Sequence, residues 1–322
     1  MTLEEFKNKS IEEQLLYDFT NDYDILKYPN NNYIYLDKVV ERFLIYKAIV
    51  GKKYKIIKEK GWEYYYGLID PDSQSPMLQE IYKKLWKYDN WSDLKKKYMQ
   101  KFDKIQGDTM TSAITFLTDN LIRTEYFSDY YNQNHVGRQK AWTLSYCCRE
   151  NKELIESLTY ENYGDLYNFI KLNHTIGNFM PVPVYFNKSR CGKAYAEDDY
   201  WFLTLERIKR YCENPGEKAI KDLLPKKSKD RKQAIANTKE WLEPYINKFD
   251  SFIKDNYLQD YEELGLIGYD KCKPDFIKKV NEVILKRGIR MLYALNNRKE
   301  EIKKLYAKYN FSIPEDLKEE LK

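Results

Sequence analysis

Residues 76–86, PMLQEIYKKLW, carry the pattern that decides the fold class of this chain. Leu78, Ile81, Tyr82 and Leu85 recur at the three- and four-residue spacing that places side chains on one face of an α-helix. A similar apolar stripe follows the capping-box sequence Thr2-x-x-Glu5, and further stripes recur along most of the chain. We therefore expect a mainly α protein, a globular multi-helix bundle.

Two short stretches depart from the helical period. Tyr54–Ile57 and Tyr64–Ile69 flank Lys60-Gly61, so a small β-hairpin is expected near residues 54–69. The remaining patterns predict helices that open at Gly107, cover Asn162–Leu172, begin at Trp201, and extend over Trp241–Tyr257 and Phe276–Tyr309.

Length and composition describe a globular chain with a mixed surface. The 322 residues are 43% hydrophobic, and 31 of them are tyrosines, which cover core and surface with a polar tip. The net charge of +5 falls short of the strong basic field of a duplex-binding domain, although it permits contact with nucleic acid. We expect an N-terminal helical core at 1–213, a basic linker at 214–237 and a C-terminal helical region at 238–322, or one domain that includes all three.

The compartment is predicted from what the sequence lacks. The five cysteines show neither CxxC nor Cys/His spacing, so no disulfide framework or zinc site is supported, and no metal is expected. The first residues lack the basic and apolar regions of a signal peptide, and no apolar run is long enough to span a bilayer. The expectation is a cytoplasmic protein without membrane contact.

The helical pattern stops at residues 174–183, HTIGNFMPVP, which Asn187 and Arg190 follow. Because an ordinary histidine side chain changes charge near neutral pH, His174 is the candidate catalytic acid or base. Gly177-Asn178 favours a left-handed turn with exposed N–H groups, and Arg190 offers a fork for phosphate or carboxylate, so these residues and Asn187 are the candidate substrate-binding groups. The alternative is structural: a histidine at a helix terminus, a Gly-Asn cap and prolines that border the next segment.

A second candidate lies at residues 107–112, GDTMTS. At the start of a helix, Asp108 and Thr109 with their small neighbours could bind a phosphate through free N–H groups. The stretch lacks the spacing and the lysine of a phosphate loop. The alternative is plain N-capping, with Asp108 as the cap residue.

Three weaker stretches complete the set of candidates. His135-Val136-Gly137-Arg138 could bind a nucleotide or form an ordinary surface loop, and Glu197-Asp198-Asp199 could bind a metal or cap a helix. The basic run Pro225–Lys232 could touch a polyanion or be a solvated segment. The chain has no GxSxG, HExxH, GxGxxG or kinase motif.

These motifs together resemble a bacterial family known as a domain of unknown function. The resemblance covers roughly Ser75 to Tyr211 and rests on GDTM with Phe116, on HTIGNF with Pro181 and Pro183, on Asn187 and Arg190, and on Asp199-Tyr200-Trp201-Phe202. It implies where a site lies but supplies no reaction. Such families are often found in mobile or phage-defence loci, which is an association rather than a physical argument.

Two functions remain open. One is a phosphate-, nucleotide- or nucleic-acid-handling effector in which His174 acts as acid or base while Arg190, Gly177 and Asp108-Thr109 bind phosphate. The other is a non-enzymatic helical scaffold with a protein or nucleic-acid partner, in which the 174–190 segment is a hinge. The sequence identifies no cofactor and does not decide whether the protein is an enzyme.

Overall fold

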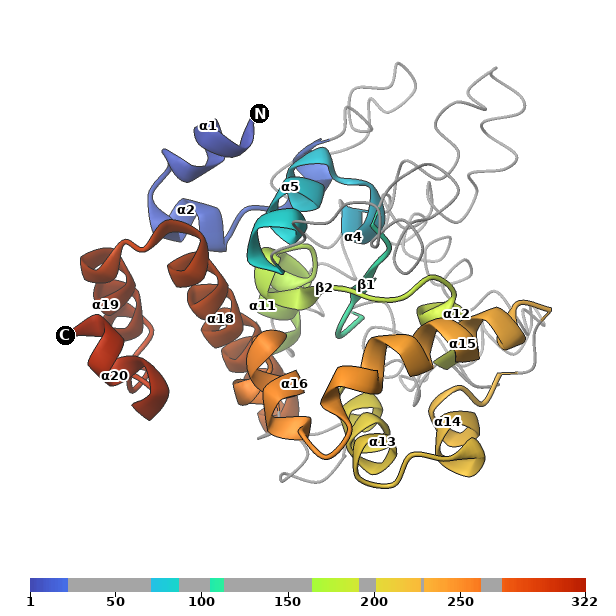
Figure 1. The fold of residues 1–322 in the computed structure, drawn as a ribbon. Coiled ribbons are helices and arrows are strands. Elements are labelled where there is room, and N and C mark those ends of the chain that lie inside the picture. The colour runs from blue at the N-terminus through green and yellow to red at the C-terminus, as the bar shows by residue number, and fades with distance from the viewer. Residues whose placement is uncertain (23–70, 87–104, 113–163, 191–200, 227–228, 262–273) are drawn as a thin grey trace, which may run out of the picture.

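The helical prediction is confirmed in a computed structural model, which describes residues 1–22, 71–86, 105–112, 164–190, 201–226, 229–261 and 274–322 (Figure 1). The described α-helices are α1 (Leu3–Lys7), α2 (Ile11–Leu15), α4 (Pro71–Gln74), α5 (Pro76–Leu85), α11 (Gly164–Leu172), α12 (Phe186–Arg190), α13 (Trp201–Glu213), α14 (Glu217–Leu223), α15 (Arg231–Leu242), α16 (Phe249–Asp255), α18 (Pro274–Asn296), α19 (Lys299–Lys308) and α20 (Glu315–Leu321). Short 3-10 turns are η1 (Phe19–Asp22), η4 (Ile176–Asn178) and η6 (Glu243–Tyr245).

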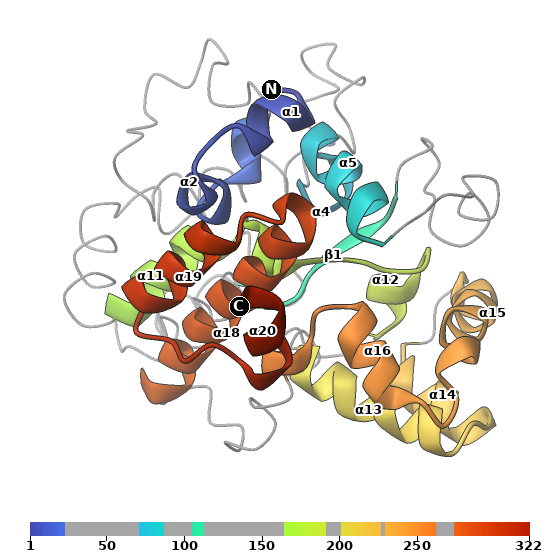
Figure 2. The same ribbon diagram turned by 60° about the vertical axis from the view of Figure 1, so that its left-hand side comes forward.

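The long helix α18 forms the centre of the fold. It packs against α11 and η4, and also against α2, α5 and α19. Figures 1 and 2 both show α13 to α16 gathered on the side of the molecule away from α1 and α2. Gly288, in the middle of α18, allows the helix to approach η4 and Leu15 closely, since an added Cβ would lie 2.5 Å from Leu15 Cδ1.

The described strands form one small antiparallel sheet. In it β1 (Gly107–Thr109) pairs with β2 (Phe179–Pro181), so that Asp108 lies opposite Met180 and Thr109 opposite Phe179. The two strands are far apart in sequence and therefore do not form a hairpin. The hairpin expected near residues 54–69 lies outside the described residues.

The prediction that a helix begins at Gly107 is wrong, because residues 107–109 form β1 instead; the rest of that predicted helix, from residue 113 onward, lies outside the described residues. Tertiary partners bind the backbone of this segment: the Ile105 N–H donates to Gln79 Oε1 (2.7 Å) and the Gly107 N–H to Ser73 Oγ (3.0 Å). A favourable local capping sequence was thus outweighed by hydrogen bonds to α4, α5 and β2.

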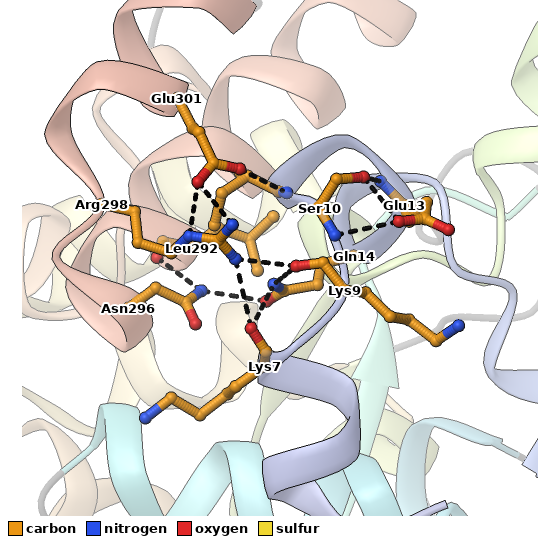
Figure 3. A network of polar contacts seen from close by, with 10 residues as sticks. Lys7, Lys9, Ser10, Glu13, Gln14, Leu292, Asn296, Arg298 and Glu301 are labelled. Atoms are coloured by element: carbon orange, nitrogen blue, oxygen red, sulfur yellow. Dashed lines mark hydrogen bonds and ion pairs between the residues drawn. The ribbon is translucent and has the colours of Figure 1, made fainter.

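The predicted capping box at Thr2 and Glu5 is confirmed, although the apolar stripe that follows it is divided between α1, α2 and η1. Thr2 and Glu5 form the capping box of α1, and Ser10 and Glu13 form a second one at α2. Figure 3 shows how the connection between these helices docks on the start of α19: Arg298 Nη1 and Gln14 Nε2 both donate to the carbonyl oxygens of Lys7 and Lys9. The connection between α1 and α2 is therefore joined to the start of α19 by half-buried polar contacts.

The C-terminal helices are shorter than the sequence patterns suggest. The predicted helix over Trp241–Tyr257 is divided by η6, which contains Pro244, into the end of α15 and α16. The predicted helix over Phe276–Tyr309 is divided at Asn297, which ends α18 with a φ of 54°. Apolar periodicity continues across both breaks, so it alone did not reveal them.

The segment 214–237, expected as a basic linker, contains α14 and the first half of α15. Ile220 and Leu223 of α14 are fully buried in the same hydrophobic core as Phe6 of α1 and Ile284 of α18. Among the described residues, no helix is both long and apolar enough to cross a membrane.

Candidate functional site

Asp108 and Arg190 form a buried ion pair that joins β1 to α12. Arg190 Nε and Nη2 donate to Asp108 Oδ2 at 3.0 and 2.7 Å, and the indole N–H of Trp201 donates to the same oxygen at 2.8 Å. The Arg190 and Asp108 side chains are only 1% and 2% exposed. The guanidinium fork that the sequence offers to a phosphate is therefore directed at a carboxylate of the chain itself.

The packing around this ion pair is aromatic. The Arg190 guanidinium lies 5.7 Å from the centre of the Trp201 ring, and Phe186 packs against both Trp201 and Trp241. The cluster takes Asp108 from β1, Arg190 and Phe186 from α12, Trp201 from α13 and Trp241 from α15. The ion pair and the aromatic contacts therefore hold α12 against these three elements.

His174 lies in a different set of contacts. Its Nδ1 is 4.0 Å from Asp18 Oδ1, its ring stacks on Phe179 with centroids 6.3 Å apart, and its carbonyl oxygen accepts the N–H of Phe19. The residue is 3% exposed. A carboxylate beside a histidine can orient the imidazole in a catalytic site, but here it also ties the N-terminal segment to the end of α11.

Gly177 is required by a close approach rather than by a left-handed turn. The left-handed conformation expected for Gly177-Asn178 is wrong, since these residues form η4 and neither has a positive φ. A Cβ on Gly177 would lie 1.9 Å from the carbonyl oxygen of Ile284 in α18. Only a residue without a side chain allows η4 and α18 to pack at this distance.

Asn178 is fully buried, and its side-chain amide forms hydrogen bonds with backbone N–H and C=O groups. Its Oδ1 accepts the Thr111 N–H at 3.0 Å, and its Nδ2 donates to the carbonyl oxygens of Thr111 and Asn173 at 2.9 Å. The hydroxyl of Tyr261 approaches the same Oδ1 at 3.5 Å, and burial raises the pKa of Tyr261 to about 12. Asn178 thus holds the segment after β1 against the end of α11.

Arg287 of α18 is a buried cation that the sequence did not single out. Its Nη1 donates to the carbonyl oxygens of Gly177 and Phe179 at 2.9 and 2.8 Å, and its Nη2 donates to that of Asn256 at 3.3 Å. Burial lowers the pKa of Arg287 to about 10. No local pattern distinguishes Arg287 from the other basic residues of a long amphipathic helix, so only the tertiary structure identifies it.

The structure joins some candidate residues and leaves others apart. Asp108 and Arg190 bind each other, and Gly177 and Asn178 share η4, whereas the contacts described for His174 involve Asp18, Phe19 and Phe179. Thr109 in β1 and Asn187 in α12 are half-buried. The stretches His135–Arg138 and Glu197–Asp199 lie outside the described residues. Within the described ranges no group of three or more His, Cys, Asp or Glu could hold a metal ion.

A basic surface lies where α12 meets the start of α15, which contact each other side by side (Figure 1). The Lys226 N–H donates to the carbonyl oxygen of Ser189 at 3.1 Å, and Lys188 Nζ lies 2.6 Å from Asp230 Oδ2. Lys188, Lys226, Lys229 and Lys232 are all exposed. We call these four lysines the α12–α15 basic surface. The sequence indicated the run at 225–232, but not that α12 adds Lys188 to it.

Comparison of the chain with models of protein families, with curated proteins and with solved structures found no match.

Proposed function

We propose that this protein binds a nucleic acid through the α12–α15 basic surface, and that the 174–190 segment is the framework that holds this surface in place. The observation that carries the proposal is the convergence of Lys188 from α12 with Lys226, Lys229 and Lys232 from the residues around the start of α15. Exposed lysines from two segments form a phosphate-binding surface without needing a base-specific contact.

The start of α15 carries positively charged side chains, although the N-terminus of a helix is the positive end of its dipole. Its first turn holds Arg231 and Lys232 and no acidic residue, whereas α1, α2, α19 and α20 all begin with acidic side chains. Asp230 stands at the N-cap position but makes no capping bond, and its carboxylate binds Lys188 instead. Each cation at a helix start costs about 0.3–1 kcal/mol, and a bound phosphate would remove that cost.

The buried ion pair supports the framework role of residues 174–190. Arg190 is the last residue of α12, and its contact with Asp108 anchors the helix that presents Lys188. Asn237 of α15 adds a second attachment by donating to the carbonyl oxygen of Val184 at 3.2 Å. We infer that residues 174–190 set the position of the lysines and leave phosphate contact to them.

Fluorescence anisotropy with labelled 20-nucleotide RNA and DNA, single-stranded and duplex, tests this proposal. The variant carries Lys226→Gln, Lys229→Gln and Lys232→Gln; the matched control carries Lys278→Gln, Lys299→Gln and Lys304→Gln, three exposed lysines of α18 and α19. Both lose three positive charges, so a difference between them reports position and not net charge.

We expect the wild type and the control to bind with a steep salt dependence. The basic-surface variant should bind at least about tenfold more weakly at 0.1 M salt, and its slope of log K against log salt should fall by about 2 to 3, because each lost phosphate contact removes about 0.7–0.9. Equal loss in the two triple variants would contradict the assignment of the surface. No binding by the wild type would leave the alternative, a helical protein whose partner is another protein.

A further inference from the structure

Tyr185 combines a strained backbone with an exposed ring at the edge of the α12–α15 basic surface. It directly precedes α12, has a φ of 69° and is 36% exposed, one of three large hydrophobic residues exposed in the described part of the chain. A positive φ is rare for a bulky residue, which suffers a clash between its Cβ and the backbone. Such strain persists only where the surrounding structure enforces it.

The contacts on either side of Tyr185 enforce this conformation. Its N–H donates to Gln106 Oε1 at 3.1 Å, its carbonyl oxygen accepts the Ser189 N–H at 3.1 Å, and the next residue, Phe186, is fully buried against Trp201 and Trp241. The backbone is therefore held on both sides of the residue, although the tyrosine ring itself remains partly in solvent.

Tyr257 provides an internal comparison. It also has a positive φ, 56°, but its ring packs edge-on against Trp86 and its hydroxyl donates to the carbonyl oxygen of Leu85 at 3.3 Å. Packing therefore explains a tyrosine at position 257. Glycine or asparagine would satisfy the backbone at 185 more easily, so the ring at this position calls for another reason.

We infer that Tyr185 is a stacking platform for an unpaired base, which makes the preferred ligand a single-stranded nucleic acid. The inference rests on the proposed function, because Lys188 and its neighbours would bind the phosphates beside the stacked base. Tyr185 directly precedes the five-residue helix that carries Lys188, and its carbonyl oxygen accepts the N–H of Ser189, the residue after Lys188. Single strands offer free base faces to aromatic side chains, whereas a duplex hides them.

Substitution Tyr185→Gly separates the ring from the backbone conformation, since glycine accepts a φ of 69° without strain. We expect this variant to keep or raise the thermal midpoint of the wild type and to bind single-stranded 20-nucleotide RNA about five- to a hundredfold more weakly. Its affinity for duplex RNA should stay within about twofold of wild type. Tyr185→Phe keeps the ring and should bind the single strand within about twofold of wild type.

A 2-aminopurine base in the single strand reports stacking directly, because its fluorescence is quenched when it stacks. We expect quenching by the wild type and by Tyr185→Phe, and its loss in Tyr185→Gly. If Tyr185→Gly binds the single strand as tightly as wild type, or weakens single strand and duplex equally, the stacking inference is wrong while the lysine surface stands. If the wild type binds neither form, the proposed function fails as well.

Discussion

Neutralising one partner of the Asp108–Arg190 pair should destabilise the protein strongly. Asp108→Asn preserves the size of the side chain and an oxygen for the Trp201 indole N–H, but leaves Arg190 as a cation that is 1% exposed. Arg190→Met preserves length and apolar contact, and removes the cation that faces the buried Asp108 carboxylate. Breaking a buried pair by removing one charge costs about 3–5 kcal/mol.

The double variant separates the interaction free energy between Asp108 and Arg190 from the loss of stability that each single substitution causes. With both charges removed, most of the desolvation penalty disappears together with the attraction, so Asp108→Asn/Arg190→Met should recover much of the lost stability. We expect a coupling energy of about 2–3 kcal/mol, typical of groups that share a buried network. The ion pair then acts mainly by fixing α12 against β1.

Thermal unfolding followed by circular dichroism measures these effects. An unfolding entropy of about 2.1 cal/mol/K per residue gives about 0.7 kcal/mol/K for the 322 residues, so each single variant should lower the midpoint by about 4–7 °C. Urea unfolding provides the free energies for the double-mutant cycle.

A different outcome would refute the structural role of the Asp108–Arg190 pair. Single variants whose midpoints change by less than about 1 °C, but which lose nucleic-acid binding at a temperature where they are folded, would refute the framework role. Asp108 and Arg190 would then be ligand-binding groups, as the sequence alone suggested.

Three further predictions concern the contacts of η4 and its neighbours. Gly177→Ala should cost about 3 kcal/mol or more in urea unfolding, because the added Cβ meets backbone of α18 that cannot give way. Gly216→Ala, at the N-cap of α14 with no atom within 4 Å of the added Cβ, should cost about 1 kcal/mol or less, and similar values for the two variants would contradict the close approach. His174→Ala should lower the thermal midpoint, with a loss of about 2 kcal/mol or more, and leave nucleic-acid affinity intact; an unchanged midpoint with lost activity on a nucleic-acid substrate would instead restore its catalytic role. The contribution of Tyr261 to stability should be lost at alkaline pH: its folded pKa, about 12, lies above its ordinary value of 10, so a contribution of about 2–3 kcal/mol is fully present below pH 10 and is lost as the pH rises towards 12, while the lowered pKa of Arg287 acts in the opposite direction. Tyr261→Phe should flatten this part of the pH profile, as measured by urea unfolding from pH 8 to 12, and an unchanged profile would show that Tyr261 does not contribute.

The stretch that the sequence singled out makes many tertiary contacts, but these contacts differ from the roles predicted for its residues. The unusual 174–190 stretch forms η4, β2 and α12, and its Arg190 binds Asp108 of the second candidate stretch. The predicted left-handed turn is wrong because glycine at position 177 serves close packing against α18 and not a turn with a positive φ. Its actual neighbour, Ile284, is more than a hundred residues away in sequence, so no local pattern could reveal the clash.

Residues that carry the proposals were only partly visible in the sequence. The basic run at 225–232 was evident, but Lys188 joins it only because α12 packs against α15. Tyr185 is one of 31 tyrosines, and nothing in its local sequence indicates a positive φ. That conformation follows from the side chain of Gln106 and from the burial of Phe186.

The sequence by itself determined the mainly α class, the face of α5 that is buried and the capped start of α1. These features depend on contacts within three or four residues, which periodicity and capping motifs report directly. Only the tertiary structure decided that residues 107–109 form a strand, that Arg190 is bound by Asp108, and that α12 presents Lys188 next to α15. Strand pairs and buried ion pairs join residues that are distant in the chain, so their free energy exists only once the fold has brought the partners together.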